Sequence, residues 1–130
     1  MVVVDTSVVL AVLLNEPTRG SILRRTRGAR VLVSGSLEWE LGNALIALLR
    51  RRRLTATDLQ RVWRSFRRIP YAIGSCDLAA ALRLAADTGL YAYDAYVVET
   101  ARAAGAPLLT LDERQRRAAL AVGVDAPEVA

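Results

Sequence analysis

Carboxylates, hydroxyls and arginines are the side chains on which any chemistry of this sequence must rest. The chain has no histidine and no lysine, and all 18 of its basic residues are arginine. The absence of histidine excludes a Ser–His or Cys–His nucleophile pair, and the absence of lysine excludes a Walker-type phosphate loop. A single cysteine, Cys76, leaves no His and Cys cluster of the kind that binds zinc.

Three aspartates stand where a strand or loop passes into a helix. Asp5 follows "VVV", Asp112 follows "PLLTL", and Asp94 lies within "LYAYDAYVVETA". Each of them could simply cap a helix. Asp94, however, has more apolar neighbours than a surface cap would have, and a buried carboxylate is costly unless something stabilises it.

A fourth candidate acid lies in the segment "LEWELGN". Helical spacing puts Glu38 and Glu40 on opposite flanks of the apolar stripe formed by Leu37, Leu41 and Leu48. The periodicity does not choose between the two glutamates.

Several carboxylates gathered without histidine or cysteine indicate a hard metal ion. Like charges packed together destabilise one another unless a cation neutralises them, and oxygen ligands select Mg²⁺ or Mn²⁺. Such an ion can activate a water molecule for attack on a phosphodiester. The acids therefore favour a nuclease.

The elements that must position these acids alternate between short β-branched runs and longer helical segments. This alternation predicts an α/β layer fold with a parallel sheet, in which ligands bind beyond the carboxyl ends of the strands. Asp5 and Asp112 fall at such ends. We expect strands at 2–4, 30–33, 70–73 and 107–111, an edge strand at 124–126, and helices at about 7–14, 17–28, 36–53, 55–68, 75–89, 94–104 and 113–122. Thr55 or Thr57 is expected to cap the fourth helix, and Ser75 the fifth.

The totals indicate one globular domain covering 1–130. The longest apolar run, Val8 to Leu14, has seven residues, whereas a membrane span needs roughly 20. The start of the chain does not have the pattern of a secretory signal, and the lone cysteine suits a reducing compartment. We therefore expect a cytoplasmic protein with no membrane segment.

Positive charge is concentrated in one stretch, which we call the basic block. Arg50 to Arg68 holds eight arginines against Asp58, within a chain of net charge +5. The block suits a phosphate backbone or an acidic partner, although exposed helix ends would also carry arginines. Trp39, Trp63 and Phe66 are expected in the core or at an interface rather than as platforms for bases.

Three segments together resemble a known family. "VVVDTSVVLAVL", "WELGNALIALLRR" and "LYAYDAYVVETARAAGAPLLTLDER", in that order and spacing, resemble a PIN domain, and most nearly the VapC-type toxins of bacterial toxin–antitoxin pairs. The resemblance covers essentially the whole chain. It implies a three-layer α/β/α fold with a mainly parallel central sheet, and a Mg²⁺- or Mn²⁺-dependent endoribonuclease.

The resemblance also implies roles for particular residues. By position, the metal-binding and catalytic acids are Asp5, Glu40, Asp94 and Asp112; Glu40 is chosen because the glutamate of the family motif precedes an asparagine by three residues, as Glu40 precedes Asn43. Ser7, Asn43 and Thr110 would orient these carboxylates or water. Some relatives carry a further acid a few residues after the fourth, where this chain has Glu113 and then Arg116.

The partners implied are an RNA substrate, a small antitoxin protein that blocks the active site, and a second copy in a homodimer. Arg64, Arg67 and Arg68 are expected to contact RNA or the antitoxin. Two alternatives remain open: a stand-alone RNA-processing PIN nuclease, and a catalytically inert module that binds nucleic acid or protein. A phospho-receiver domain is disfavoured because it needs a lysine, and a dehalogenase-type phosphatase because Ser7 replaces the second aspartate of its motif.

Overall fold

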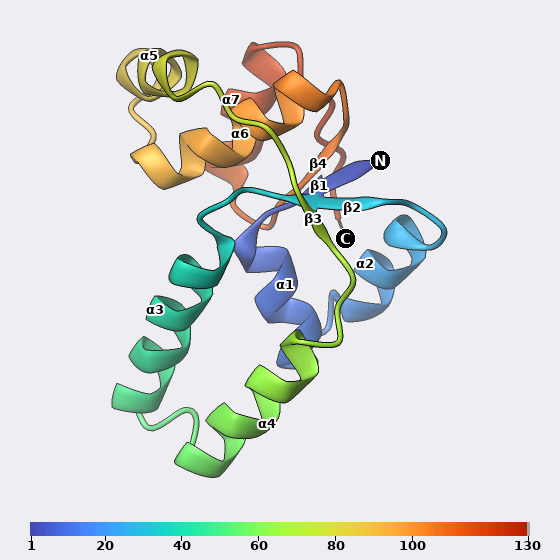
Figure 1. The fold of residues 1–130 in the computed structure, drawn as a ribbon, viewed down its shortest axis with the longest axis vertical. Helices are drawn as coiled ribbons and strands as arrows, with labels where there is room; N and C mark the ends of the chain where they lie inside the picture. Colours follow the sequence, from blue (N-terminus) through green and yellow to red (C-terminus); the bar gives the residue numbers. More distant parts are fainter. Residues whose placement is uncertain (130) are drawn as a thin grey trace.

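A parallel four-stranded sheet lies at the centre of the molecule (Figure 1). The structure is a computed structural model and describes residues 1–129. The strand order is β3-β2-β1-β4, and every pairing is parallel. The strands are β1 (Val2–Val4), β2 (Val31–Val33), β3 (Ala72–Ile73) and β4 (Leu108–Leu109). The predicted mixed α/β fold with a parallel sheet is confirmed.

Strand β1 is buried on both faces, which explains its run of three valines. Val3 pairs with Leu32 on one side and with Leu108 on the other. Val2 and Val4 point into one core, whereas Val3 points into the other. Because side chains alternate across a strand, a strand covered on both faces needs an apolar residue at every position.

Seven helices in residues 1–129 cover the two faces of this sheet (Figure 1). The core that contains Val2 and Val4 is completed by Ile22, Leu45 and Phe66, and the core that contains Val3 by Val97 and Val98. The first face carries α1 (Thr6–Leu13), α2 (Arg19–Thr26), α3 (Leu37–Arg50) and α4 (Ala56–Phe66), and the second carries α5 (Leu78–Thr88), α6 (Ala92–Ala104) and α7 (Glu113–Ala121). The architecture is therefore three-layered.

The helix starts at α5 and α6 differ from the sequence predictions in a way that changes the role of the residues there. Asp77 rather than Ser75 caps α5, and its Oδ1 accepts the Ala80 N–H at 3.2 Å. Helix α6 begins at Ala92 after Tyr91, so Asp94 lies inside the first turn and is not the capping residue. The sequence did not decide whether Thr55 or Thr57 caps α4. In the structure Thr55 is the cap, and it forms a capping box with Asp58.

The predicted edge strand at 124–126 is wrong. The segment runs beside β4 and accepts one hydrogen bond, from the Leu108 N–H to the Asp125 carbonyl at 2.8 Å. Pro127 has no N–H to continue a ladder, so the contact stops there. None of the helices in residues 1–129 has the length and apolar character needed to cross a bilayer.

Candidate metal centre

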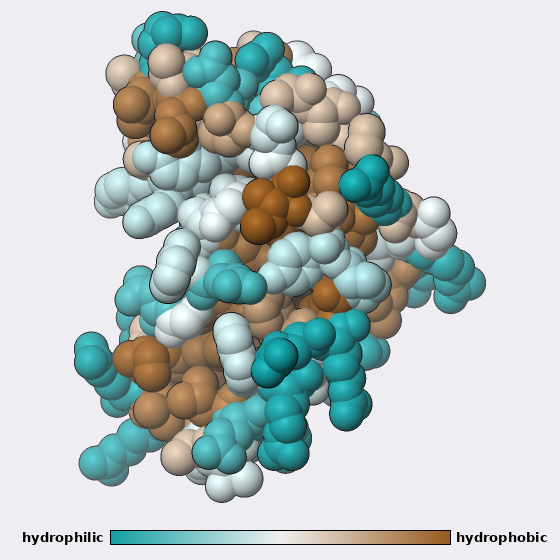
Figure 2. All heavy atoms as spheres, viewed as in Figure 1, coloured by the Kyte–Doolittle hydropathy of each residue, from teal (hydrophilic) through white to brown (hydrophobic). Residues whose placement is uncertain are grey.

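Three of the four predicted acids lie on the wall of one cavity. It has a volume of about 530 Å³ and opens between α3 and the start of α6, where Figure 2 shows a notch on the left of the molecule. Its wall is formed by Asp5, Thr6, Trp39, Glu40, Asn43, Ala44, Ala47, Tyr91, Tyr93 and Asp94. Asp5, Glu40 and Asp94 come from three separate elements, so the fold and not local sequence brings them together.

Asp5 is fixed at the carboxyl end of β1. Its N–H donates to the Leu109 carbonyl at 3.0 Å, which holds it beside the end of β4, and its side chain is only 6% exposed. The carboxylate caps α1 by accepting the Ser7 N–H at 3.2 Å and the Ser7 hydroxyl at 2.7 Å. The capping role of Asp5 is thus real, and the same carboxylate also borders the cavity.

Gln115 is a site residue that sequence reasoning missed. Its side chain is fully buried, and its Nε2 donates to the Asp94 carbonyl at 3.1 Å and to Asp5 Oδ1 at 3.5 Å. Its Oε1 accepts the Thr110 hydroxyl at 2.6 Å. The reversed amide would turn an oxygen toward the Asp5 carboxylate, so this orientation is the one that electrostatics favours. Gln115 therefore ties the end of β4, the start of α6 and Asp5 together.

Glu40 lines the cavity, whereas Glu38 points elsewhere. Ser36 donates its hydroxyl to Glu40 Oε2 at 2.8 Å, and Glu38 accepts the Tyr71 hydroxyl at 2.9 Å. Asn43 lies on the same wall as Glu40, but within residues 1–129 no hydrogen bond joins the two side chains. Ser36 therefore orients the Glu40 carboxylate in this structure, and the role predicted for Asn43 stays a prediction.

Asp94 and Glu40 both have a raised pKa. Burial is the main cause in each case, and the negative charge of Asp5 adds to it. The charge of Asp112 raises the pKa of Asp94 further, while Arg114 acts in the opposite direction. When no cation is present, burial and the negative charge of the neighbouring acids disfavour the ionised form of both carboxylates.

Asp112 stands at the margin of this group. Its Oδ1 caps α7 by accepting the N–H groups of Arg114 and Gln115, and its own N–H donates to the Thr110 hydroxyl at 3.0 Å. It does not line the cavity, and it is linked to the other acids by the charge that it exerts on Asp94 and through the Thr110 hydroxyl, which also donates to Asp5 Oδ2 at 3.4 Å. Arg116, where some relatives carry an acid, instead pairs with Glu113 and donates to the Ala126 carbonyl.

The donor set fits a hydrated divalent cation. No ion pair in residues 1–129 neutralises Asp5, Glu40 or Asp94. The buried Thr6 hydroxyl, on the same wall, has no hydrogen-bond partner among these residues. The acids surround the cavity without closing on one point, and no group of three or more His, Cys, Asp or Glu side chains in the described part forms a metal cage. An ion that keeps several of its waters, as Mg²⁺ does, suits this spacing.

The raised pKa values predict how stability depends on pH when metal is absent. Between the unfolded and the higher folded pKa, the folded protein binds more protons, so the free energy of unfolding falls as pH rises. This loss should begin above the ordinary glutamate value of 4.5 and be complete above the folded pKa of Glu40. Urea unfolding measured in the presence of a chelator should show this fall of the free energy of unfolding with pH, and Glu40→Gln should make the fall smaller. An unchanged slope in Glu40→Gln contradicts the assignment.

One aromatic side chain lies where the core prediction did not put it. Phe66 is buried as expected, but Trp39 is 77% exposed on the cavity wall, so of the two settings expected for it, core or interface, the core is excluded. Arg64, Arg67 and Arg68 are exposed and do not line the cavity. Hydrophilic side chains gather over α4 in Figure 2, and Arg64 flanks a separate apolar groove between α3 and α4 with Trp63.

Comparisons with known proteins show a family and a shared fold. The model of the PIN domain matches residues 2–120. The solved structure of PAE2754 from Pyrobaculum aerophilum is 23% identical with a TM-score of 0.66, and the match covers 96% of this chain and 89% of that one. FitAcB from Neisseria gonorrhoeae is 17% identical with a TM-score of 0.68, and the match covers 99% and 98%. At these identities the two structures show a shared fold. None of the curated proteins compared matches this chain.

Proposed function

The chain belongs to the PIN domain family, and from this premise we propose that it is a Mg²⁺- or Mn²⁺-dependent endoribonuclease. PIN domains are generally nucleases and typically use divalent metal ions. The observation that carries the proposal is the convergence of Asp5, Glu40 and Asp94 on one cavity without a basic partner. An acidic cavity of this kind repels a phosphodiester unless a cation occupies it.

In this proposal Asp5, Glu40 and Asp94 hold the metal, with Asp112 at the edge. Bound Mg²⁺ would supply an activated water and neutralise charge on the phosphate. Ser36 holds the carboxylate of Glu40 toward the cavity, and Ser7 and Gln115 hold that of Asp5. These hydrogen bonds fix the ligands before substrate arrives, which reduces reorganisation during hydrolysis.

The RNA backbone has a route from the cavity to the basic block. Glu40, Ala44 and Ala47 line the cavity along one face of α3, and Arg51 follows Ala47 by four residues on the same face. Arginines along this route would contact phosphates on either side of the cleavage position.

The proposed biological role is that of a VapC-type toxin, cytoplasmic and homodimeric, that a small antitoxin protein inhibits. The sequence resemblance supports it, and the apolar groove beside Trp63 and Arg64 offers a surface for a partner. A stand-alone RNA-processing nuclease would have the same chemistry without the antitoxin. An inert binding module is disfavoured because all four acids are present.

The direct test of the activity is incubation of purified protein with total cellular RNA, with Mg²⁺, with Mn²⁺ and with chelator. Discrete fragments that need the metal are expected, because a positioned site cuts selected positions. Intact RNA under every condition, from protein shown to be folded, contradicts the proposed activity.

Neutralising the arginines of α4 should weaken binding to RNA or to the antitoxin. The triple variant Arg64→Gln, Arg67→Gln and Arg68→Gln should lower one of these affinities and flatten its salt dependence. For single-stranded RNA the slope of log K against log[salt] should fall by roughly 2, since each lost phosphate contact contributes about 0.7. Fluorescence anisotropy at several salt concentrations measures this. Unchanged binding to both partners rejects a role for these three side chains.

A further inference from the structure

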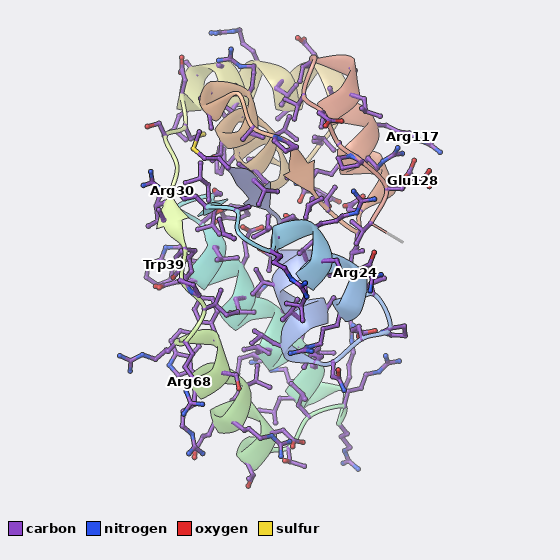
Figure 3. All side chains as sticks on the ribbon, turned by 90° about the vertical axis from the view of Figure 1, so that its right-hand side faces the viewer. Arg24, Arg30, Trp39, Arg68, Arg117 and Glu128 are labelled. Atoms are coloured by element: carbon purple, nitrogen blue, oxygen red, sulfur yellow. The ribbon has the colours of Figure 1, made fainter. Side chains whose placement is uncertain are left out.

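We propose that Trp39, Tyr91 and Tyr93 form a base-binding subsite beside the acidic cavity, on which unpaired bases of an RNA strand stack. The choice of RNA as ligand rests on the proposed nuclease function. Trp39 comes from α3 and the two tyrosines from the start of α6, so the rings approach the cavity from two elements. Figure 3 shows Trp39 at the edge of the molecule.

The exposure of these rings is the first argument. Trp39 is 77% exposed, Tyr91 78% and Tyr93 54%. Apolar surface left in water contributes little to folding, so these rings stabilise the monomer poorly. They are nevertheless three of the chain's seven aromatic side chains, and all three line one cavity. Such clustering marks a surface that binds something.

The remaining aromatic rings are used differently. Phe66 packs between Trp63 and Tyr71, with ring centroids 5.3 and 5.7 Å apart. Tyr96 supports Tyr93 edge-on, at 5.7 Å and an interplanar angle of 87°. That contact holds the Tyr93 ring in place while half of its surface stays open, which is the preorganisation that a stacking platform needs.

Charge is the second argument, and it favours bases over an acidic protein partner. The cavity wall includes three carboxylates and, within the described residues, no arginine. Away from a bound metal ion, this wall offers no cationic side chain to a phosphate or an acidic side chain, whereas stacking on a base does not depend on net charge. Contacts of RNA to this wall beside the metal are therefore best made to its bases, and the rings are the side chains suited to make them.

The placement of the rings relative to the acids is the third argument. Trp39 directly precedes Glu40, Tyr93 directly precedes Asp94, and Tyr91 lies one helical turn before Asp94. The same backbone that positions each acid therefore positions a ring. A base stacked on these rings would set which phosphate reaches the carboxylates.

Tryptophan fluorescence can test the subsite without relying on cleavage. In a Trp63→Phe background Trp39 is the only tryptophan. The probe is a short mixed-sequence single-stranded 2′-O-methyl RNA with Mg²⁺ present, compared with an abasic oligonucleotide of equal length. We expect quenching by the first probe and little by the second. Trp39→Ala should weaken binding of the first probe by about 5- to 150-fold, the range that base–aromatic stacking gives, and Trp39→Phe should restore most of it. Leu82→Ala, at an exposed apolar position on α5, is the control.

The outcomes separate the subsite from the proposed activity. Unchanged RNA affinity in folded Trp39→Ala overturns the subsite, even if the protein cleaves RNA. Equal binding of the abasic probe overturns it as well, because contacts would then be to the backbone. A Trp39 signal that responds to protein concentration and not to RNA assigns the rings to a protein interface. Base-dependent quenching in a protein that cleaves no RNA supports the subsite and rejects the nuclease.

Discussion

Asp5→Asn should reduce metal-dependent RNA cleavage by at least about 10³-fold, because a metal ion contributes several kcal/mol to charge stabilisation and each 1.36 kcal/mol is about tenfold in rate. Asparagine lacks the negative charge that holds a hard cation. It remains a good helix cap, so it can still accept the Ser7 N–H at the start of α1. Cleavage rates with Mg²⁺ should therefore collapse while the protein stays folded.

The stability of the same variant separates catalysis from folding. The Asp5 charge raises the pKa of both Glu40 and Asp94, so its removal should relieve repulsion in metal-free buffer. We expect the free energy of unfolding near neutral pH to change by less than about 1 kcal/mol. Asp87→Asn, at an exposed position of α5, is the matched control and should cleave normally. Wild-type cleavage by Asp5→Asn would exclude Asp5 as a metal ligand.

Gln115→Leu should be the most damaging substitution outside the acids. Leucine has a similar volume but cannot make the hydrogen bonds of Gln115 to the Asp94 carbonyl and the Thr110 hydroxyl. Each hydrogen bond lost in this way costs about 0.5–1.5 kcal/mol, which thermal or urea unfolding would measure. Loss of the contact to Asp5 should also lower cleavage by about 10- to 100-fold, as loss of outer-shell support of a metal ligand does.

Two comparisons show whether Gln115 acts through the site. Leu120→Ala, on the same helix at a side chain 46% exposed, should change neither stability nor cleavage appreciably. Raising Mg²⁺ should recover part of the activity of Gln115→Leu, because misplaced ligands weaken metal binding first. A variant that loses stability but keeps the wild-type metal dependence of cleavage would limit Gln115 to a structural role.

The sequence indicated the sheet and two of its acids for a physical reason. A short run of three β-branched valines favours a strand covered on both faces, and the residue after such a strand lies at the edge where parallel sheets bind ligands. Asp5 and Asp112 followed directly from that rule, and β1 and β4 are indeed neighbours. For Glu38 and Glu40, which lie on a helix flank, the periodicity left the choice open and the family resemblance chose Glu40, the residue that the structure places on the cavity wall.

Gln115 and Trp39 show what local patterns leave out. Gln115 is surrounded by arginines in "ERQRRAALA", a pattern that predicts an exposed side chain. In the structure it shares the buried face of α7 with Ala118 and Ala119, three and four residues later. That spacing was the available signal. Trp39 was expected in the core or at an interface because large aromatic side chains are usually buried. Leu37, Leu41 and Leu45 already fill the inward face of α3, so the Trp39 side chain points outward.

Anomalous X-ray diffraction from crystals soaked in Mn²⁺ would show whether Asp5, Glu40 and Asp94 hold a metal ion. We expect one anomalous peak or more inside the cavity, within coordination distance of carboxylate oxygens of Asp5 and of Glu40 or Asp94, and no such peak in Asp5→Asn. A cavity without Mn²⁺ at saturating concentration, or Mn²⁺ bound only at acids outside it, would contradict a metal-dependent nuclease built on these residues.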